Sequence, residues 1–89
     1  MKKLVNVQEV DGEGLVGLMG EKVMLFCLNY IYAGTLTGVN DKDVLLTDAS
    51  IVYETGDLRA KSFKDSQNLP DDLYVRTSAI ESYCKSGRS

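Results

Sequence analysis

Hydrophobic runs separated by turn-forming residues fill the chain after residue 20 and predict a mainly β structure. In the first run, 22–28, both sets of alternating side chains are apolar, so we expect a strand that is covered on both faces. The second run, 31–39, contains Gly34 and Gly38, and a glycine inside a strand marks a bend or a close approach of backbones. The third run, 44–53, is long and follows this glycine-containing strand, which predicts a strongly bent antiparallel sheet.

Apolar residues at helical spacing predict a short N-terminal helix over 11–20. These residues are Leu15, Leu18 and Met19. Asp11 can cap the start of the helix, and Gly20 can end it. Because the glycines inside the segment each weaken a helix by about 1 kcal/mol, packing of the apolar face has to hold it together.

The stretch 55–72 holds most of the remaining charge and the single proline, Pro70. Its charges are of both signs and nearly balanced, which is typical of a solvated excursion rather than of a binding arm. We therefore expect a long variable loop at 55–72. Two short strands, over 73–77 and 80–84, should follow it with a tight turn between them.

A short helix, three antiparallel strands, a loop and two short strands is the order of elements in a small, five-stranded SH3-like barrel. Within that order, the chain resembles the Sm-like (LSm) proteins. The segments similar to the family's first motif are 20–25, 32–41 and 44–49, and the segment similar to its second motif is 73–80. The fixed points of the pattern are Gly34, Asp48 and Arg76. The resemblance implies one Sm-like domain over 1–89, with its core at about 11–84.

Sm-like proteins form rings, so the resemblance implies a pentameric to heptameric homo-oligomer. Physical chemistry points the same way, because short final strands with apolar side chains leave unpaired edge groups that invite a neighbour's strand. If the fourth strand of each copy pairs with the fifth strand of the next, the contact is heterologous and can close into a ring. The predicted interface residues are Leu73, Tyr74, Val75, Ile80, Ser82 and Tyr83.

In such a ring, the loops 40–43 and 76–78 of every copy would line one rim of the central pore. An arginine there can stack on a base and bond a phosphate, while neighbouring hydroxyl and amide groups can bind base edges or the 2′-hydroxyl. The residues predicted to bind single-stranded RNA are Asn40, Asp41, Lys42, Asp43, Arg76, Thr77 and Ser78. The alternative is that Arg76 pairs with Asp41, Asp43 or Asp48 and only fixes the ring geometry.

Two positions depart from the family's pattern. The loop 40–43 lacks the aromatic or histidine side chain that stacks on a base, and threonine and serine follow the arginine where the family has glycine and an acidic or amide residue. Tyr30 and Tyr32 are other candidates for stacking, although packing in a core or an interface is the stronger interpretation. For Asp48 we expect a buried carboxylate bonded to backbone amides.

Composition limits the chemistry that is open to this chain. Its 89 residues hold 10 Lys and Arg against 13 Asp and Glu, and this net charge of −3 argues against duplex DNA as a partner. With no histidine and no paired acids, we expect no catalytic site, no metal site and no cofactor. Cys27 and Cys84 are expected to be reduced structural thiols. The sequence contains neither a signal-peptide pattern nor a membrane-length apolar stretch, which predicts a cytoplasmic protein.

Two functional hypotheses follow. The first is a homo-oligomeric ring that binds short single-stranded RNA at its pore-side loops and takes part in RNA metabolism or regulation. The second is a structural or protein-interaction ring of the same fold that binds no RNA. The acidic net charge and the missing stacking side chain favour the second hypothesis, whereas Arg76 and the extent of the resemblance favour the first.

Overall fold

The computed structural model describes residues 14–86, and strands account for most of them. The strands are β1 (Lys22–Cys27), β2 (Ile31–Val39), β3 (Asp43–Glu54), β4 (Asp65–Asn68), β5 (Leu73–Arg76) and β6 (Ile80–Lys85). Two 3-10 turns, η1 (Val16–Leu18) and η2 (Thr77–Ala79), precede β1 and β6. The prediction of a mainly β, antiparallel structure is confirmed, and the first three predicted strands correspond to β1, β2 and β3.

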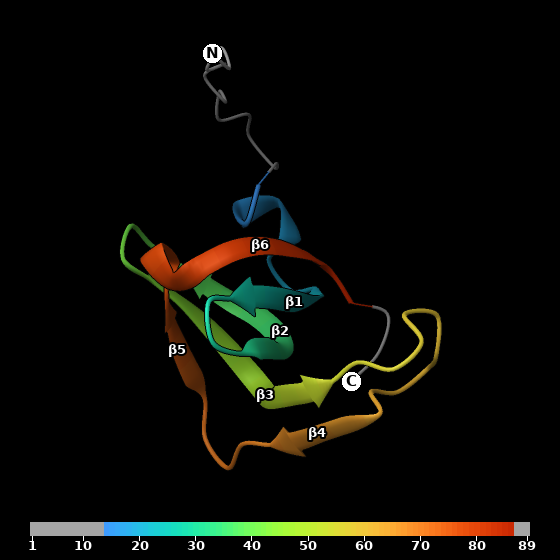
Figure 1. Cartoon of the computed structure of the whole chain (residues 1–89). Helices are drawn as coiled ribbons and strands as arrows, with labels where there is room; N and C mark the ends of the chain where they lie inside the picture. The colour runs from blue at the N-terminus through green and yellow to red at the C-terminus, as the bar shows by residue number, and fades with distance from the viewer. Residues whose placement is uncertain (1–13, 87–89) are drawn as a thin grey trace, which may run out of the picture.

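All strand pairs are antiparallel, and the sheet runs in the order β4-β3-β2-β1-β6. The central strand β3 pairs with β2 on one side, while its other side pairs first with β5, from Asp43 opposite Arg76 onward, and then with β4. Figure 1 shows β5 and β6 following one another through η2 at one end of the molecule. Because β5 and β6 do not pair with each other in the described chain, the sheet stays open between them.

The predicted closed barrel of five strands therefore differs from the observed sheet, which is open and has six strands. The additional strand, β4, lies inside the stretch 55–72, where we predicted only a loop. Pro70 lies in the short segment between β4 and β5. In this segment the chain moves away from β3, and it pairs with β3 again at β5. A proline has no backbone N–H to donate, so it suits this interruption between two strands that share one partner.

The predicted N-terminal helix is also corrected. Its first residues, 11–13, lie outside the described part of the chain, and the remainder forms only the 3-10 turn η1. Gly14 and Gly20 have φ values of 69° and 83°, in the left-handed region that an α-helix excludes. Within residues 14–86, no helical segment is long and apolar enough to cross a membrane.

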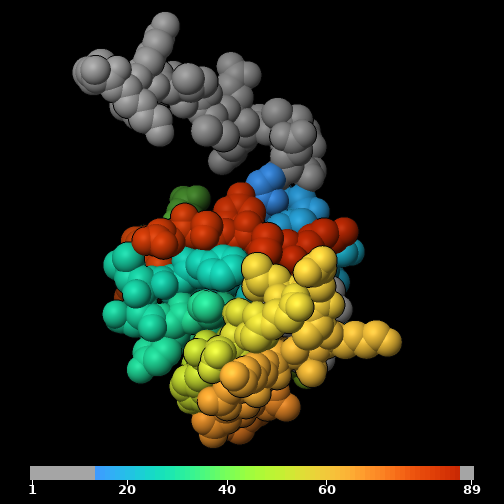
Figure 2. All heavy atoms as spheres, turned by 45° about the vertical axis from the view of Figure 1, so that its right-hand side comes forward, coloured from blue at the N-terminus to red at the C-terminus, as the bar shows by residue number. Residues whose placement is uncertain are grey.

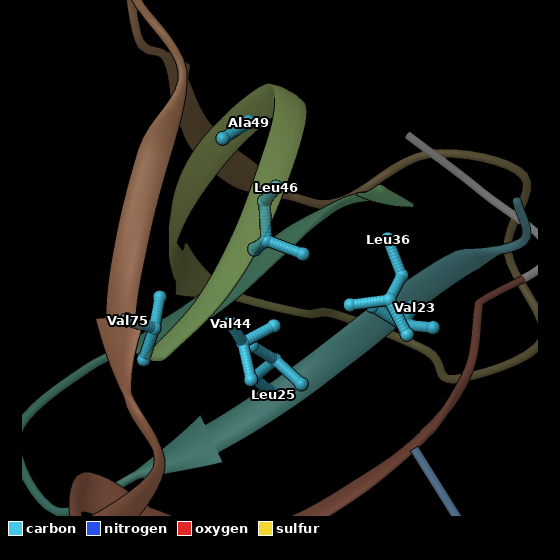
Figure 3. Close-up of a cluster of buried hydrophobic side chains, with 7 residues drawn as sticks. All are labelled: Val23, Leu25, Leu36, Val44, Leu46, Ala49 and Val75. Atoms are coloured by element: carbon cyan, nitrogen blue, oxygen red, sulfur yellow. The ribbon is translucent and has the colours of Figure 1, made fainter. Parts of the chain in front are cut away.

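An inner hydrophobic cluster lies on the concave side of the curved sheet (Figure 3). Its buried members are Val23, Leu25, Leu36, Val44, Leu46, Ala49 and Val75. Figure 3 shows these side chains gathering from β1, β2, β3 and β5 into one space. The shared cluster therefore connects the last strands of the chain to the first.

A second, outer cluster covers the other face of the sheet and consists of Met24, Ala33, Val52 and Phe63. The prediction of a strand covered on both faces is confirmed for the middle of β1, because Met24 joins this cluster while its neighbours join the inner one. Leu28, at the end of the predicted run, is instead exposed. Phe63 is only 8 % exposed and comes from the stretch that we predicted to be solvated. Figure 2 shows that segment (yellow) on the surface between the β1–β2 hairpin (teal) and β4 (orange). It is thus a cover for the sheet and not only an excursion into solvent.

A β-bulge bends the middle of the sheet. Between Ala33 opposite Ser50 and Thr35 opposite Thr47, β2 contributes one residue, Gly34, where β3 contributes two. A side chain at Gly34 would begin 3.0 Å from the carbonyl oxygen of Thr47, so only a glycine fits there without movement. The glycine signal in the sequence therefore marked a real close approach, as predicted.

Candidate functional site

The two predicted site loops, 40–43 and 76–78, meet at one end of β3. The backbone N–H of Thr77 donates to the carbonyl oxygen of Lys42 at 2.8 Å. The Thr77 hydroxyl donates to the carbonyl oxygen of Asp41 at 2.9 Å and lies 3.3 Å from that of Lys42. We call this pair of hydrogen-bonded loops the loop junction. It brings all seven residues predicted to bind RNA into one region.

Asn40 builds the first of these loops. Its side-chain oxygen accepts the backbone N–H groups of Lys42 and Asp43, each at 2.8 Å. Its own backbone N–H donates to the Asp43 carbonyl oxygen at 2.9 Å, which closes the turn between β2 and β3. This arrangement is typical of asparagine in turns. The amide N–H groups of the Asn40 side chain are therefore the part that a ligand can use.

The charged side chains of the loop junction face solvent. Arg76 is 77 % exposed, and its Nε lies 3.9 Å from a carboxylate oxygen of Asp43. Asp41, Asp43 and Asp48 were the predicted partners of this arginine, and Asp43 is the one that lies beside it. An ion pair so exposed and so long contributes little stability, and it leaves the other guanidinium donors in reach of a ligand. Asp41, Lys42 and Ser78 are exposed beside it.

Asp48 is not part of this site, and the prediction that its carboxylate is buried is wrong. Asp48 is exposed and has a φ of 50°, in the left-handed region. It is one of the two β3 residues in the bulge opposite Gly34. The extra residue shifts the alternation of β3, so that Ala49 joins the inner cluster and Asp48 faces outward.

The predicted interface residues divide into two groups. Val75 is buried in the inner cluster, and Leu73 and Ile80 are half-buried against it. Tyr74, Ser82 and Tyr83 are exposed. β5 pairs only with β3, and β6 pairs only with β1, so within residues 14–86 each has one edge without a neighbouring strand.

An apolar hollow of about 300 Å³ lies beside β5, and sequence reasoning missed it. Its walls include Cys27, Leu28, Tyr30, Tyr32 and Tyr74, from β1, β2, β5 and the turn between β1 and β2. Leu28 is 75 % exposed and Tyr74 is 69 % exposed, although both are apolar for most of their surface. In the sequence, the two closely spaced tyrosines Tyr30 and Tyr32 were the feature that could have indicated this hollow. In the structure, their ring centroids lie 6.2 Å apart.

Burial changes the titration of two groups in this apolar hollow. Desolvation raises the pKa of the Cys27 thiol above its ordinary value of 9.0. Desolvation also raises the pKa of Tyr32, with smaller contributions from the nearby Cys27 and Tyr30. Both groups are therefore neutral at physiological pH, and the charged side chain at the edge of the apolar hollow is that of Arg76.

The chemistry that the loop junction can perform is binding by hydrogen bonds and by an exposed cation. Among the residues that the structure describes, no group of three His, Cys, Asp or Glu side chains gathers in a way that could hold a metal ion. No family model matches the chain, and no curated protein matches it in sequence.

Proposed function

We propose that the protein assembles into a homo-oligomeric Sm-like ring, pentameric to heptameric, and binds short single-stranded RNA at the loop junction. Its role would lie in RNA metabolism or regulation, as a binding module and not as an enzyme. The observation that carries the proposal is the pair of Thr77 hydrogen bonds, which join the loops 40–43 and 76–78 next to the unpaired edge of β5.

The open sheet supports the ring. β5 and β6 are consecutive in the chain, yet each ends the sheet on a different side and, among residues 14–86, has one edge without a partner strand. If the free edge of β5 pairs with β6 of the next copy, each copy uses two different surfaces, and repetition closes a ring when the rotation divides a full turn. Backbone hydrogen bonds would then satisfy both edges.

The apolar hollow gives this contact side chains as well as backbone. It lies next to β5, and its exposed members Leu28, Tyr30 and Tyr74 form the kind of patch that marks an interaction surface. In the proposed ring, an apolar side chain from β6 of the neighbouring copy fills this hollow. Burial of these residues would add stability that a small lone domain lacks.

RNA would bind where the loop junctions of all copies gather on one rim of the pore. Arg76 supplies a guanidinium that can stack on a base and bond a phosphate, and Lys42 adds a second cation. The exposed Ser78 hydroxyl and the Asn40 amide can bond base edges or the 2′-hydroxyl. Because the chain has a net charge of −3, we expect selective, salt-sensitive binding and no affinity for duplex DNA.

The second candidate is a protein-interaction ring that binds no RNA. The ion pair between Arg76 and Asp43 favours this candidate, since the pair uses part of the guanidinium within the protein.

We propose the cytoplasm as the location for either function. The free thiols Cys27 and Cys84 suit a reducing compartment.

A titration separates the two functions. Labelled single-stranded oligouridine, oligoadenosine and a DNA duplex are added at about 50 and about 200 mM salt, and binding is followed by fluorescence anisotropy. The proposal expects RNA binding that weakens with salt and falls at least tenfold in Arg76→Gln. Arg59→Gln is the matched control, because Arg59 is equally charged, 94 % exposed and outside the loop junction. A ring that binds no oligonucleotide at the lower salt would leave the protein-interaction function.

A further inference from the structure

A polar hollow of about 600 Å³ lies away from the loop junction, over the bulge between β2 and β3. β1 contributes Lys22 to its wall, β3 contributes Asp48 and Ser50, and β4 contributes Asn68. Its volume is in the range of small-molecule sites in proteins. We call it the polar hollow.

The bulge creates the floor of the polar hollow. Ala33, Gly34 and Ala49 line it, and they carry methyl groups or no side chain at all. Gly34 cannot be larger, because a Cβ there would lie 3.0 Å from the Thr47 carbonyl oxygen. A Cβ at Gly34 would point toward β3 and Leu46, so Gly34 lines the hollow with backbone alone, and a ligand could rest on this backbone and on the Ala33 methyl group.

One wall of the polar hollow holds a fixed hydrogen-bonding group. Ser50 is only 5 % exposed, and its hydroxyl donates to the side-chain oxygen of Asn68 at 2.7 Å. This bond orients the Asn68 amide and leaves its two N–H groups as donors. Ser66 and Thr35 add hydroxyl groups that can donate or accept.

Two opposite charges stand on opposite sides of this floor. Lys22 lies opposite Thr35 on the neighbouring strand, and Asp48 lies on the strand beyond it, so about 10 Å of sheet separates their backbones. Neither side chain belongs to an ion pair within residues 14–86. Asp48 also holds a left-handed backbone that disfavours side chains by about 1 kcal/mol, and such strain is often kept at functional positions.

This combination selects a class of ligand. One cation and one anion give no net charge, which disfavours both a nucleotide phosphate and a divalent metal ion. The lining contains no aromatic ring, which is what the face of a base or a sugar would stack on. A compact zwitterion, with its two charges a short distance apart, can satisfy both.

We propose that the polar hollow binds a free amino acid. Its carboxylate would face the Lys22 ammonium group, and its ammonium group would face the Asp48 carboxylate. The amino-acid side chain would point outward along the open side of the hollow. This proposal depends neither on the ring nor on RNA, since all of its residues belong to one copy.

The test is an amide NMR titration of the whole ¹⁵N-labelled chain with each of the common amino acids at millimolar concentration. The proposal expects at least one of them to shift the amides of Thr35, Asp48, Ser50 and Asn68. The same amino acid as its methyl ester, or with its amine acetylated, lacks one of the two charges and should bind at least tenfold more weakly.

Matched variants complete the test. Asp48→Asn removes the charge while asparagine tolerates the left-handed backbone, and Lys22→Gln removes the other charge; each should weaken binding at least tenfold. Asp65→Asn and Lys61→Gln change exposed charges outside the polar hollow and should have no effect. Absence of amide shifts at these positions for every amino acid would overturn the proposal. Binding that survives both charge-removing variants would overturn it as well.

Discussion

The Thr77 hydroxyl donates to the carbonyl oxygen of Asp41 at 2.9 Å, and so joins two loops that are 36 residues apart in the chain. The backbone N–H of the same threonine donates to Lys42. One residue therefore holds the turn after β2 against the end of β5. The position of Arg76, directly before Thr77, depends on this connection.

Replacing Thr77 with valine keeps the branched shape and removes the hydroxyl. We expect Thr77→Val to lower the free energy of unfolding by about 1 kcal/mol, because the hydrogen bond to Asp41 is lost. Urea unfolding measures this change. Thr37→Val is the control, since the Thr37 hydroxyl makes a longer bond of 3.3 Å to Leu45, within one pair of strands, and should matter less. Equal effects of the two variants would contradict the importance given to the loop junction.

The close approach at the bulge predicts a contrast between two glycines of β2. Gly34→Ala should destabilise the protein by about 2 kcal/mol, because the new Cβ meets the Thr47 carbonyl oxygen at 3.0 Å and the Ala49 Cα at 3.2 Å. Gly38→Ala should change stability by less than about 0.5 kcal/mol, because its Cβ would meet only the Leu45 side chain at 3.4 Å. Thermal or urea unfolding of both variants tests this, and similar losses would show that the sheet yields at Gly34.

Phe63 makes the segment before β4 part of the folded structure. Removing its ring in Phe63→Ala should lower the free energy of unfolding by about 3 kcal/mol, because the outer cluster loses its largest cover. Leu58→Ala, in the same segment, should have almost no effect because Leu58 is 72 % exposed. If Phe63→Ala is as stable as Leu58→Ala, the segment is a solvated loop after all.

The half-buried Cys27 thiol predicts a loss of stability in alkaline solution. Its pKa is raised in the folded state, so the thiol ionises first in the unfolded chain and draws the equilibrium toward unfolding. The stabilisation that the neutral thiol contributes is complete below the pKa of Cys27 in the unfolded chain, near 9.0. It is lost as the pH rises through the higher pKa of Cys27 in the folded protein. Urea midpoints at about pH 8 and about pH 10 should therefore differ less in Cys27→Ala than in the unchanged protein. Cys84→Ala should keep the full difference.

The sequence predicted the parts of the fold that rest on local pattern. The apolar alternation of 22–28 indicated a strand covered on both faces, and Gly34 indicated the close approach that became the bulge. β4 escaped prediction because Asp65–Asn68 is entirely polar and exposed, so its strand geometry comes from pairing with β3. The helix over 11–20 was overestimated because Gly14 and Gly20 hold left-handed backbones.

The candidate site divides in the same way. That the loops 40–43 and 76–78 would lie on one side was implied by the family resemblance, and within one copy the structure brings them together. The polar and apolar hollows could not be predicted, because they depend on the curvature of the sheet and on side chains far apart in sequence. Asp48 shows the limit most clearly: nothing in its sequence neighbours indicates a left-handed backbone or an outward side chain.

Assembly of the ring predicts a specific effect at the apolar hollow. Tyr74→Glu should weaken assembly, because a carboxylate would be buried against Leu28 and Tyr30 when a neighbour covers them. Tyr53→Glu is the matched control, since Tyr53 is also exposed but lies outside the apolar hollow. Size-exclusion profiles at several protein concentrations compare the two. A profile for Tyr74→Glu that matches the control would exclude the apolar hollow from the contact.

The central claim is the ring, and the mass of the particle in solution tests it most directly. Multi-angle light scattering on the whole chain should give a mass between those of a pentamer and a heptamer of the 9.8 kDa protomer. The mass should stay constant over a wide range of protein concentrations, as expected for a closed assembly. A constant mass of 9.8 kDa would contradict the ring and, with it, the proposed use of the β5 and β6 edges.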